Sequence, residues 1–65
     1  MQILVNGEPI VTNARTLAEL CATLDLAQAK IATADNVSFV ASAKRELTNL
    51  SPKDEVEIVA PRQGG

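Results

Sequence analysis

The feature that most constrains this chain is the pair Asn6-Gly7, which stands between two short runs rich in β-branched residues. A two-residue type I′ turn needs a positive φ at both central positions, and Asn-Gly adopts it readily. The pair therefore predicts a β-hairpin that joins residues 2–5 to residues 9–12. Because Pro9 has no N–H to give to a ladder, we expect the second strand at an edge of the sheet.

The next segment carries the start signal of an α-helix. Thr16 and Glu19 have the spacing of a capping box, in which the two residues satisfy backbone N–H groups of the first turn. Apolar residues then follow at the spacing of one buried stripe: Leu17, Leu20, Cys21 and Leu24. We expect a helix over residues 16–24 that packs this stripe on the sheet, with an end near Asp25 that no glycine marks.

The middle of the chain predicts two further short strands. Residues 31–34 and 38–41 are apolar runs separated by a polar turn. Residues 42–50 indicate a helical turn or loop, with Leu47 and Leu50 available to fill the core.

A last strand is predicted over residues 55–59. Its side chains alternate, with Val56 and Ile58 inward and Val59 among those that point outward. The order is hairpin, helix, two short strands and a final strand. This order predicts an α+β, β-grasp (ubiquitin-like) fold: a mixed four- to five-stranded sheet with one main helix on one face and the first and last strands parallel neighbours.

Composition excludes several classes of function. One cysteine allows no internal disulfide, and the absence of histidine argues against the usual zinc and iron sites. A net charge of −2, with both signs spread along the chain, argues against a nucleic-acid partner. The sequence shows no signal peptide and no long apolar span, so we expect a soluble cytoplasmic protein without a membrane partner.

The sequence ends in Pro61-Arg62-Gln63-Gly64-Gly65, directly after the last predicted strand. We expect two parts: a β-grasp domain over residues 1–60 and a flexible tail over residues 61–65. Proline ends the strand, and five extended residues reach roughly 17 Å. Two glycines without a Cβ give a thin tip, whose terminal carboxylate can enter a narrow slot in another protein. The alternative is a frayed terminus.

Over its whole length the chain resembles the ThiS family of small sulfur carriers, which serve in making the thiazole of thiamine. The resemblance is carried by the opening residues 1–7, the helix start Thr16-Leu17, the pair Phe39-Val40 and the ending from Glu57 to Gly65. Three turns depart from the family's usual pattern: Asn36-Val37 stands for Asn-Gly, Ala41-Ser42 for Pro-Arg, and Lys53-Asp54 for Gly-Asp.

The resemblance implies a protein cosubstrate rather than an enzyme. A ThiF-type adenylating enzyme would join the Gly65 carboxylate to AMP, and a sulfur donor such as a cysteine desulfurase would convert it to a thiocarboxylate for thiazole synthase. Mg·ATP would bind the partner, because this chain has no phosphate-binding loop, and no cofactor is expected on the chain itself. Gly64, Gln63 and Arg62 would bind the partner together with the carboxylate.

Two other functions remain open at this point. The small subunit of molybdopterin synthase has the same fold and tail, and a ubiquitin-like modifier or interaction module would also fit. We interpret Cys21 as a small core hydrophobe rather than a sulfur-handling thiol, because it lies on the apolar stripe of the helix.

A docking surface is expected on the outer face of the sheet. Leu4 and Val59 both alternate away from the core on neighbouring strands, so we expect them side by side, with Val11 extending the patch.

Overall fold

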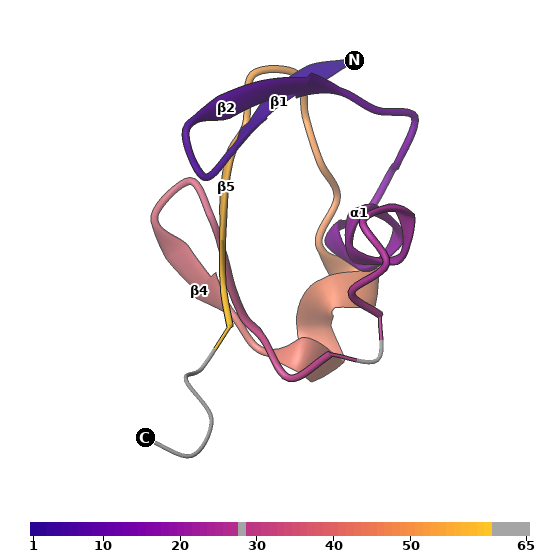
Figure 1. Ribbon diagram of the computed structural model, residues 1–65, viewed down its shortest axis with the longest axis vertical. Helices are drawn as coiled ribbons and strands as arrows, with labels where there is room; N and C mark the ends of the chain where they lie inside the picture. Colours follow the sequence, from indigo (N-terminus) through magenta and orange to yellow (C-terminus); the bar gives the residue numbers. More distant parts are fainter. Residues whose placement is uncertain (28, 61–65) are drawn as a thin grey trace.

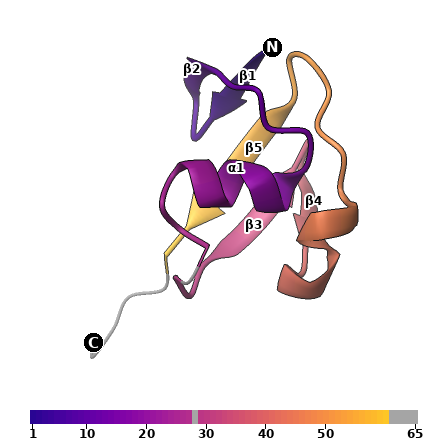
Figure 2. The same cartoon turned by 90° about the vertical axis from the view of Figure 1, so that its right-hand side faces the viewer.

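The structure is a computed structural model that describes residues 1–27 and 29–60. Within them, five strands form one sheet in the order β2-β1-β5-β3-β4. The strands are β1 (Gln2–Val5), β2 (Glu8–Val11), β3 (Ala32–Asp35), β4 (Ser38–Val40) and β5 (Glu55–Val59). Helix α1 (Leu17–Thr23) covers one face of the sheet beside a 3₁₀-helix, η1 (Ser42–Leu47) (Figures 1 and 2). The predicted β-grasp fold is confirmed.

The sheet is mixed, as expected. β1 pairs antiparallel with β2 and parallel with β5, while β3 pairs antiparallel with both β4 and β5. The first and last strands are therefore neighbours, β5 lies in the centre of the sheet, and the proline-bearing β2 lies at one edge. None of the helices in the described part of the chain has the length and apolar character that a membrane crossing requires.

The two hairpin turns are both fastened to β5 by asparagine side chains. Asn6 accepts a hydrogen bond from the Ile58 N–H (2.8 Å) and donates one to the Ile58 carbonyl (3.1 Å). Asn36 accepts one from the Glu55 N–H (2.9 Å), and its own N–H donates to the Glu55 carbonyl (2.8 Å). The central strand is thus bonded from both sides beyond its strand ladders.

Helix α1 begins as the capping box predicts. Thr16 Oγ1 accepts a hydrogen bond from the Glu19 N–H (3.2 Å), and Glu19 Oε1 accepts one from the Arg15 N–H (2.7 Å). The carboxylate reaches one residue further back than in the common form of the motif, in which it bonds the N–H of the capping residue. The first bond satisfies an N–H group that the first turn leaves without a partner, and the second ties the residue before the N-cap to the same turn.

The helix ends in a Schellman motif built on an aspartate. Asp25 has a φ of +64°, its N–H donates to the Ala22 carbonyl (3.0 Å), and the Leu26 N–H donates to the Cys21 carbonyl (2.8 Å). Aspartate tolerates the left-handed conformation better than most residues, so the stop needs no glycine. The sequence correctly predicted that the helix ends near Asp25, but the Schellman motif was not predicted.

The core lies between α1 and the sheet. The buried apolar residues are Ile3, Ala14, Leu17, Leu20, Cys21, Val40, Leu50 and Val56. The prediction for Leu50 is confirmed, but the one for Leu47 is wrong: as the last residue of η1 it is 74% exposed. Leu24 lies only at the margin of the predicted stripe, 37% exposed at the helix C-cap.

An arginine, rather than Leu47, joins η1 to the sheet. Arg45 Nε donates to Thr33 Oγ1 (3.0 Å) and Arg45 Nη2 donates to the Ile31 carbonyl (2.7 Å). Thr33 is itself buried and donates to the Val40 carbonyl (2.8 Å), so the polar groups beneath η1 are satisfied.

Leu20 provides a test of the core. Its side chain is fully buried, so Leu20→Ala is expected to lower the free energy of unfolding by about 2–5 kcal/mol, measured by urea titration. Leu47→Ala is the matched control and is expected to change it by less than about 0.5 kcal/mol. Equal effects of the two substitutions would contradict the placement of the core.

The β3–β4 turn carries backbone strain that the β1–β2 turn avoids. Each turn begins with an asparagine in the left-handed region, but the second position is Gly7 (φ +84°) in one and Val37 (φ +76°) in the other. A β-branched residue there is unfavourable by about 1–2 kcal/mol. Val37 is 89% exposed, so little packing within the chain offsets this cost.

We therefore expect Val37→Gly to raise the free energy of unfolding by about 1 kcal/mol, because glycine adopts this φ without a Cβ clash. Gly7→Val is the matched reverse substitution. A Cβ at Gly7 has no atom within 4 Å, so its expected loss of stability comes from the backbone alone. Urea titrations that show Val37→Gly to be neutral or destabilising would contradict the strain.

Candidate functional site

Most of the predicted site falls beyond the residues that the structure describes. Arg62, Gln63, Gly64 and Gly65 are in that group. Strand β5, which leads to them, runs through the centre of the sheet and ends at Val59, away from the N-terminus (Figure 1). The described part of the candidate site therefore consists of the outer face of the sheet and the strand that precedes the tail.

Leu4 and Val59 do not form one patch, and that prediction is wrong. Leu4 pairs with Glu55, whereas Val59 pairs with Ala32 on the other side of β5. The two side chains share the outer face but are separated by four residues along β5, about 13 Å. The reason is that β1 turns away at Asn6, after pairing with only the beginning of β5.

Val59 instead belongs to an apolar surface formed with β3 and β4. The hollow on this surface is lined by Ala32, Thr33, Ala34, Phe39, Glu57 and Val59, and we call its four apolar residues, Ala32, Ala34, Phe39 and Val59, the tail-end patch. The side chains of Phe39 and Val59 are 73% and 60% exposed. Val11 is 80% exposed but lies on β2, at the opposite edge of the sheet, and does not extend this patch.

Phe39 is the residue that sequence reasoning missed. The signal was present in the hairpin register: Thr33 pairs with Val40 on the inner face, which places Ala34 and Phe39 on the outer face. The only aromatic side chain of the protein is therefore on the surface, on the edge strand β4, with β3 between it and the strand that leads to the tail.

A pair of carboxyl groups lies at the other end of β5. Asp54 Oδ1 accepts a hydrogen bond from Asn36 Nδ2 (3.0 Å) and Asp54 Oδ2 accepts one from the Ser51 N–H (3.0 Å). Asp35 Oδ1 is buried, and none of the described residues bonds it within standard geometry. The pair therefore has one well-bonded carboxylate and one that is poorly solvated.

These surroundings move the two pKa values apart. Burial, and then the negative charge of Asp54, raise the pKa of Asp35 from 3.8 to about 6. Burial by itself would raise the pKa of Asp54, but hydrogen bonds from Asn36, Ser51 and Asp35 together outweigh it and lower that pKa. Asp35 is therefore the group that gains a proton first as the pH falls.

This arrangement predicts a pH dependence of stability. Because the pKa of Asp35 is raised on folding, its stabilising contribution is complete below about pH 4 and is lost as the pH rises through about 6. Asp35→Asn is expected to remove this loss and to raise the urea midpoint at pH 7. Glu46→Gln, on exposed η1, is the control and should leave the pH profile unchanged. A wild-type midpoint that rises between pH 4 and pH 6.5 would contradict the assignment.

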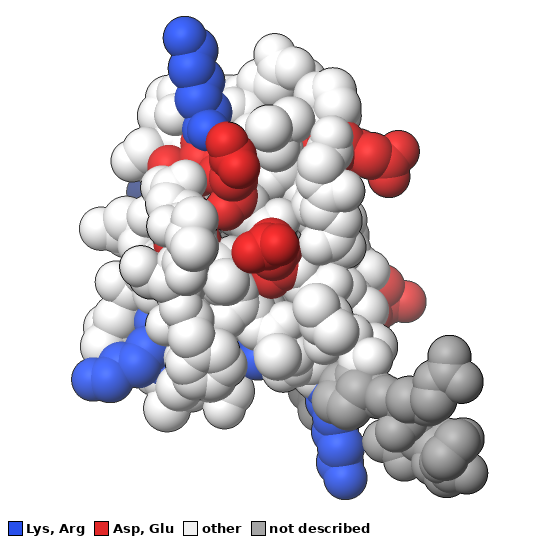
Figure 3. All heavy atoms as spheres, turned by 90° about the vertical axis from the view of Figure 1, so that its left-hand side faces the viewer, with Lys and Arg blue, Asp and Glu red and all other residues white. Residues whose placement is uncertain are grey.

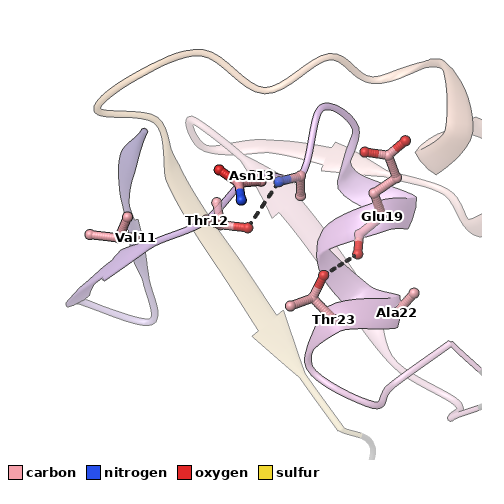
Figure 4. A pocket seen from close by; sticks show the side chains of 7 residues that line it. Val11, Thr12, Asn13, Glu19, Ala22 and Thr23 are labelled. Carbon is pink, nitrogen blue, oxygen red and sulfur yellow. Dashed lines mark hydrogen bonds between the residues drawn. The ribbon is translucent and has the colours of Figure 1, made fainter.

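A polar hollow beside the helix is not a candidate site. It lies between the end of β2 and α1 and has a volume of about 590 Å³ (Figure 4). Both of its hydroxyl groups are already bonded: Thr12 Oγ1 accepts from the Ala14 N–H (3.0 Å), and Thr23 Oγ1 donates to the Glu19 carbonyl (2.9 Å). These bonds hold the strand–helix connection and leave no convergent set of groups for a ligand.

Cys21 and metal chemistry add nothing to the site. Cys21 is buried in the core, and burial raises the pKa of its thiol more than the charge of Arg45 lowers it, so it is a poor nucleophile. The described residues contain no group of three or more side chains placed to hold a metal ion.

The sheet order, the single covering helix and the central strand that leads to the sequence end define a ubiquitin-like, β-grasp protein. Residues 2–65 match the ThiS family, and the chain belongs to that family of small sulfur carrier proteins.

Solved structures agree with this assignment. A crystal structure of the thiamine biosynthesis protein ThiS from Geobacter metallireducens is 26% identical, with a TM-score of 0.84, and each chain covers 100% of the other. A solution NMR structure of a thiamine biosynthesis protein from the same organism is 25% identical, with a TM-score of 0.79, over 100% of this chain and 88% of that one. Comparison with functionally curated proteins gives no match.

Proposed function

We propose that this protein carries sulfur for the thiazole of thiamine on the carboxyl group of Gly65. The observation that carries the proposal is the family match, which extends through the Gly64-Gly65 ending on a β-grasp body. The likeness to ThiS from Geobacter metallireducens over the full length of both chains supports it.

The proposed chemistry activates a poor electrophile. The Gly65 carboxylate attacks the α-phosphorus of ATP, so that an acyl-adenylate forms and pyrophosphate leaves. The terminal sulfur of a cysteine persulfide on a donor protein, a cysteine desulfurase or a similar enzyme, then displaces AMP and forms an acyl disulfide. A thiol reductant cleaves the S–S bond of this intermediate and leaves a thiocarboxylate, whose sulfur attacks the acceptor bound to thiazole synthase. ATP and Mg²⁺ belong to the adenylating enzyme, of the ThiF type, and this chain is its protein cosubstrate.

The residues before Gly65 are proposed to guide the tail. Gly64 lacks a Cβ and lets the backbone pass through a narrow channel, while Gln63 and Arg62 offer polar groups to its walls. The tail-end patch gives the partner an apolar surface beside the strand from which the tail leaves. Val59 contributes to this surface, and Leu4 to a separate groove near the beginning of β5.

Mass spectrometry tests the proposal directly. Incubated with the adenylating enzyme of the same organism, Mg·ATP and a sulfur donor, the protein is expected to gain one sulfur and lose one oxygen, with the change at Gly65. One further residue after Gly65 is expected to abolish the change, because the carboxylate then lies out of register. Gly64→Ala is expected to slow it by about tenfold, while the urea midpoint stays the same.

Variants of the core serve as controls. Cys21→Ala is expected to be modified as fully as the wild type, because the thiol takes no part in the transfer. Modification of the extended protein at the wild-type rate would refute the proposal and leave an interaction module.

A further inference from the structure

A groove on the outer face of the sheet lies between the two hairpin turns. It has a volume of about 420 Å³ and crosses β5 near its beginning. It is lined by the apolar residues Leu4 and Val37 and by the acidic residues Glu55 and Glu57. The side chain of Asn6, which also lines the groove, is engaged with the Ile58 backbone. The groove therefore combines apolar walls with two acidic groups.

Packing within the chain does not explain why a valine stands at position 37. It is 89% exposed and is held at a φ of +76°, where the equivalent position of the other hairpin is glycine. Strain of this kind persists where a residue serves a site. Here the side chain lines the groove, so its apolar surface is available to a second molecule.

The charge of this face is complementary to a cation. Glu55 and Glu57 are exposed on the central strand, two residues apart and on the same face. Acidic side chains lie in the middle of the outer face and at one of its edges, and basic side chains lie toward its top and bottom (Figure 3). A partner that covers this face meets a negative potential at the groove.

We propose that the groove binds an arginine side chain of the adenylating enzyme. An arginine matches both parts of the groove: its aliphatic stem packs along Leu4 and Val37, and its planar guanidinium donates to the carboxylates of Glu55 and Glu57. A lysine offers a compact charge without the fork, and a purely apolar side chain leaves both carboxylates without a partner.

The choice of this enzyme rests on the proposed function and on the course of β5. The groove lies at the beginning of β5, and the end of the same strand leads to Gly65. The two ends of the strand, Glu55 and Val59, are four residues apart, which is about 13 Å along the strand. Because α1 and η1 cover the other face of the sheet, an enzyme that takes the Gly65 carboxylate into its active site meets β5 on its outer face. The groove then holds the folded domain of the carrier against the enzyme, while the tail extends into the active site.

Isothermal titration of the carrier with the adenylating enzyme, without ATP, measures this contact apart from catalysis. Glu55→Gln/Glu57→Gln is expected to raise Kd by about tenfold, the loss of a charge-assisted hydrogen bond. Val37→Gly is expected to raise Kd by about threefold, although it stabilises the fold. The matched controls on η1, Glu46→Gln and Leu47→Ala, are expected to change Kd by less than twofold.

A double-mutant cycle identifies the occupant. Each surface arginine of the enzyme is replaced by methionine, which keeps an unbranched apolar stem and removes the charge. One such substitution is expected to raise Kd for the wild-type carrier by about tenfold and to have no further effect on the Glu55→Gln/Glu57→Gln carrier.

The outcomes separate the two proposals. A Kd that is unchanged by the double substitution, or the absence of any coupled arginine, overturns the arginine groove even where Gly65 becomes a thiocarboxylate. Absence of the mass change in the wild type overturns the carrier function, and the titration still decides whether the groove is a contact for this enzyme. Absence of any binding by the wild type overturns the groove proposal.

Discussion

The structure depends on the hydrogen bonding of β5 in the middle of the sheet. This last strand is inserted between β1 and β3, which come from opposite halves of the chain, and it is the strand that makes one sheet of two hairpins. The asparagines of the two turns add bonds to its backbone at Ile58 and Glu55. Val56 is at the same time one of the most buried side chains of the core. Folding is therefore complete only when the final residues of the domain are in place, and the tail is joined directly to the element on which the whole sheet is built.

The two asparagines explain why the turns are specified so strongly. In each hairpin a left-handed asparagine shapes the turn, and its side chain bonds the central strand. Two requirements thus fall on one residue: a φ that most side chains avoid and an amide that can both donate and accept. Asn36 also donates to Asp54, which links the β3–β4 turn to the carboxyl pair at the start of β5. One end of β5 is in this way held by polar contacts, while the other end carries the apolar tail-end patch.

Much of this arrangement could be predicted from the sequence, and the reasons for the failures are physical. The Asn6-Gly7 turn, the capping box at Thr16 and the alternation along β5 are local signals, and the structure confirms all three. The separation of Leu4 from Val59 was not predictable in this way, because periodicity gives the face of a side chain but not the register between distant strands. The prediction that Leu47 fills the core was wrong because residues 42–47 form a 3₁₀-helix, whose period differs from that of an α-helix. Arg45, rather than Leu47, therefore turns inward. The roles of the tail residues were predicted from their chemistry and from the family resemblance, and the structure describes none of these residues.

The fastening of β5 has a mechanical consequence. A partner that grips the tail and pulls along the strand loads the parallel contact with β1 and the antiparallel contact with β3 in shear. All of the hydrogen bonds across both interfaces, with those from Asn6 and Asn36, then resist the force together instead of opening one after another. The body therefore acts as an anchor against tension, and an enzyme can draw the end of the chain taut in its channel without unravelling the domain behind it.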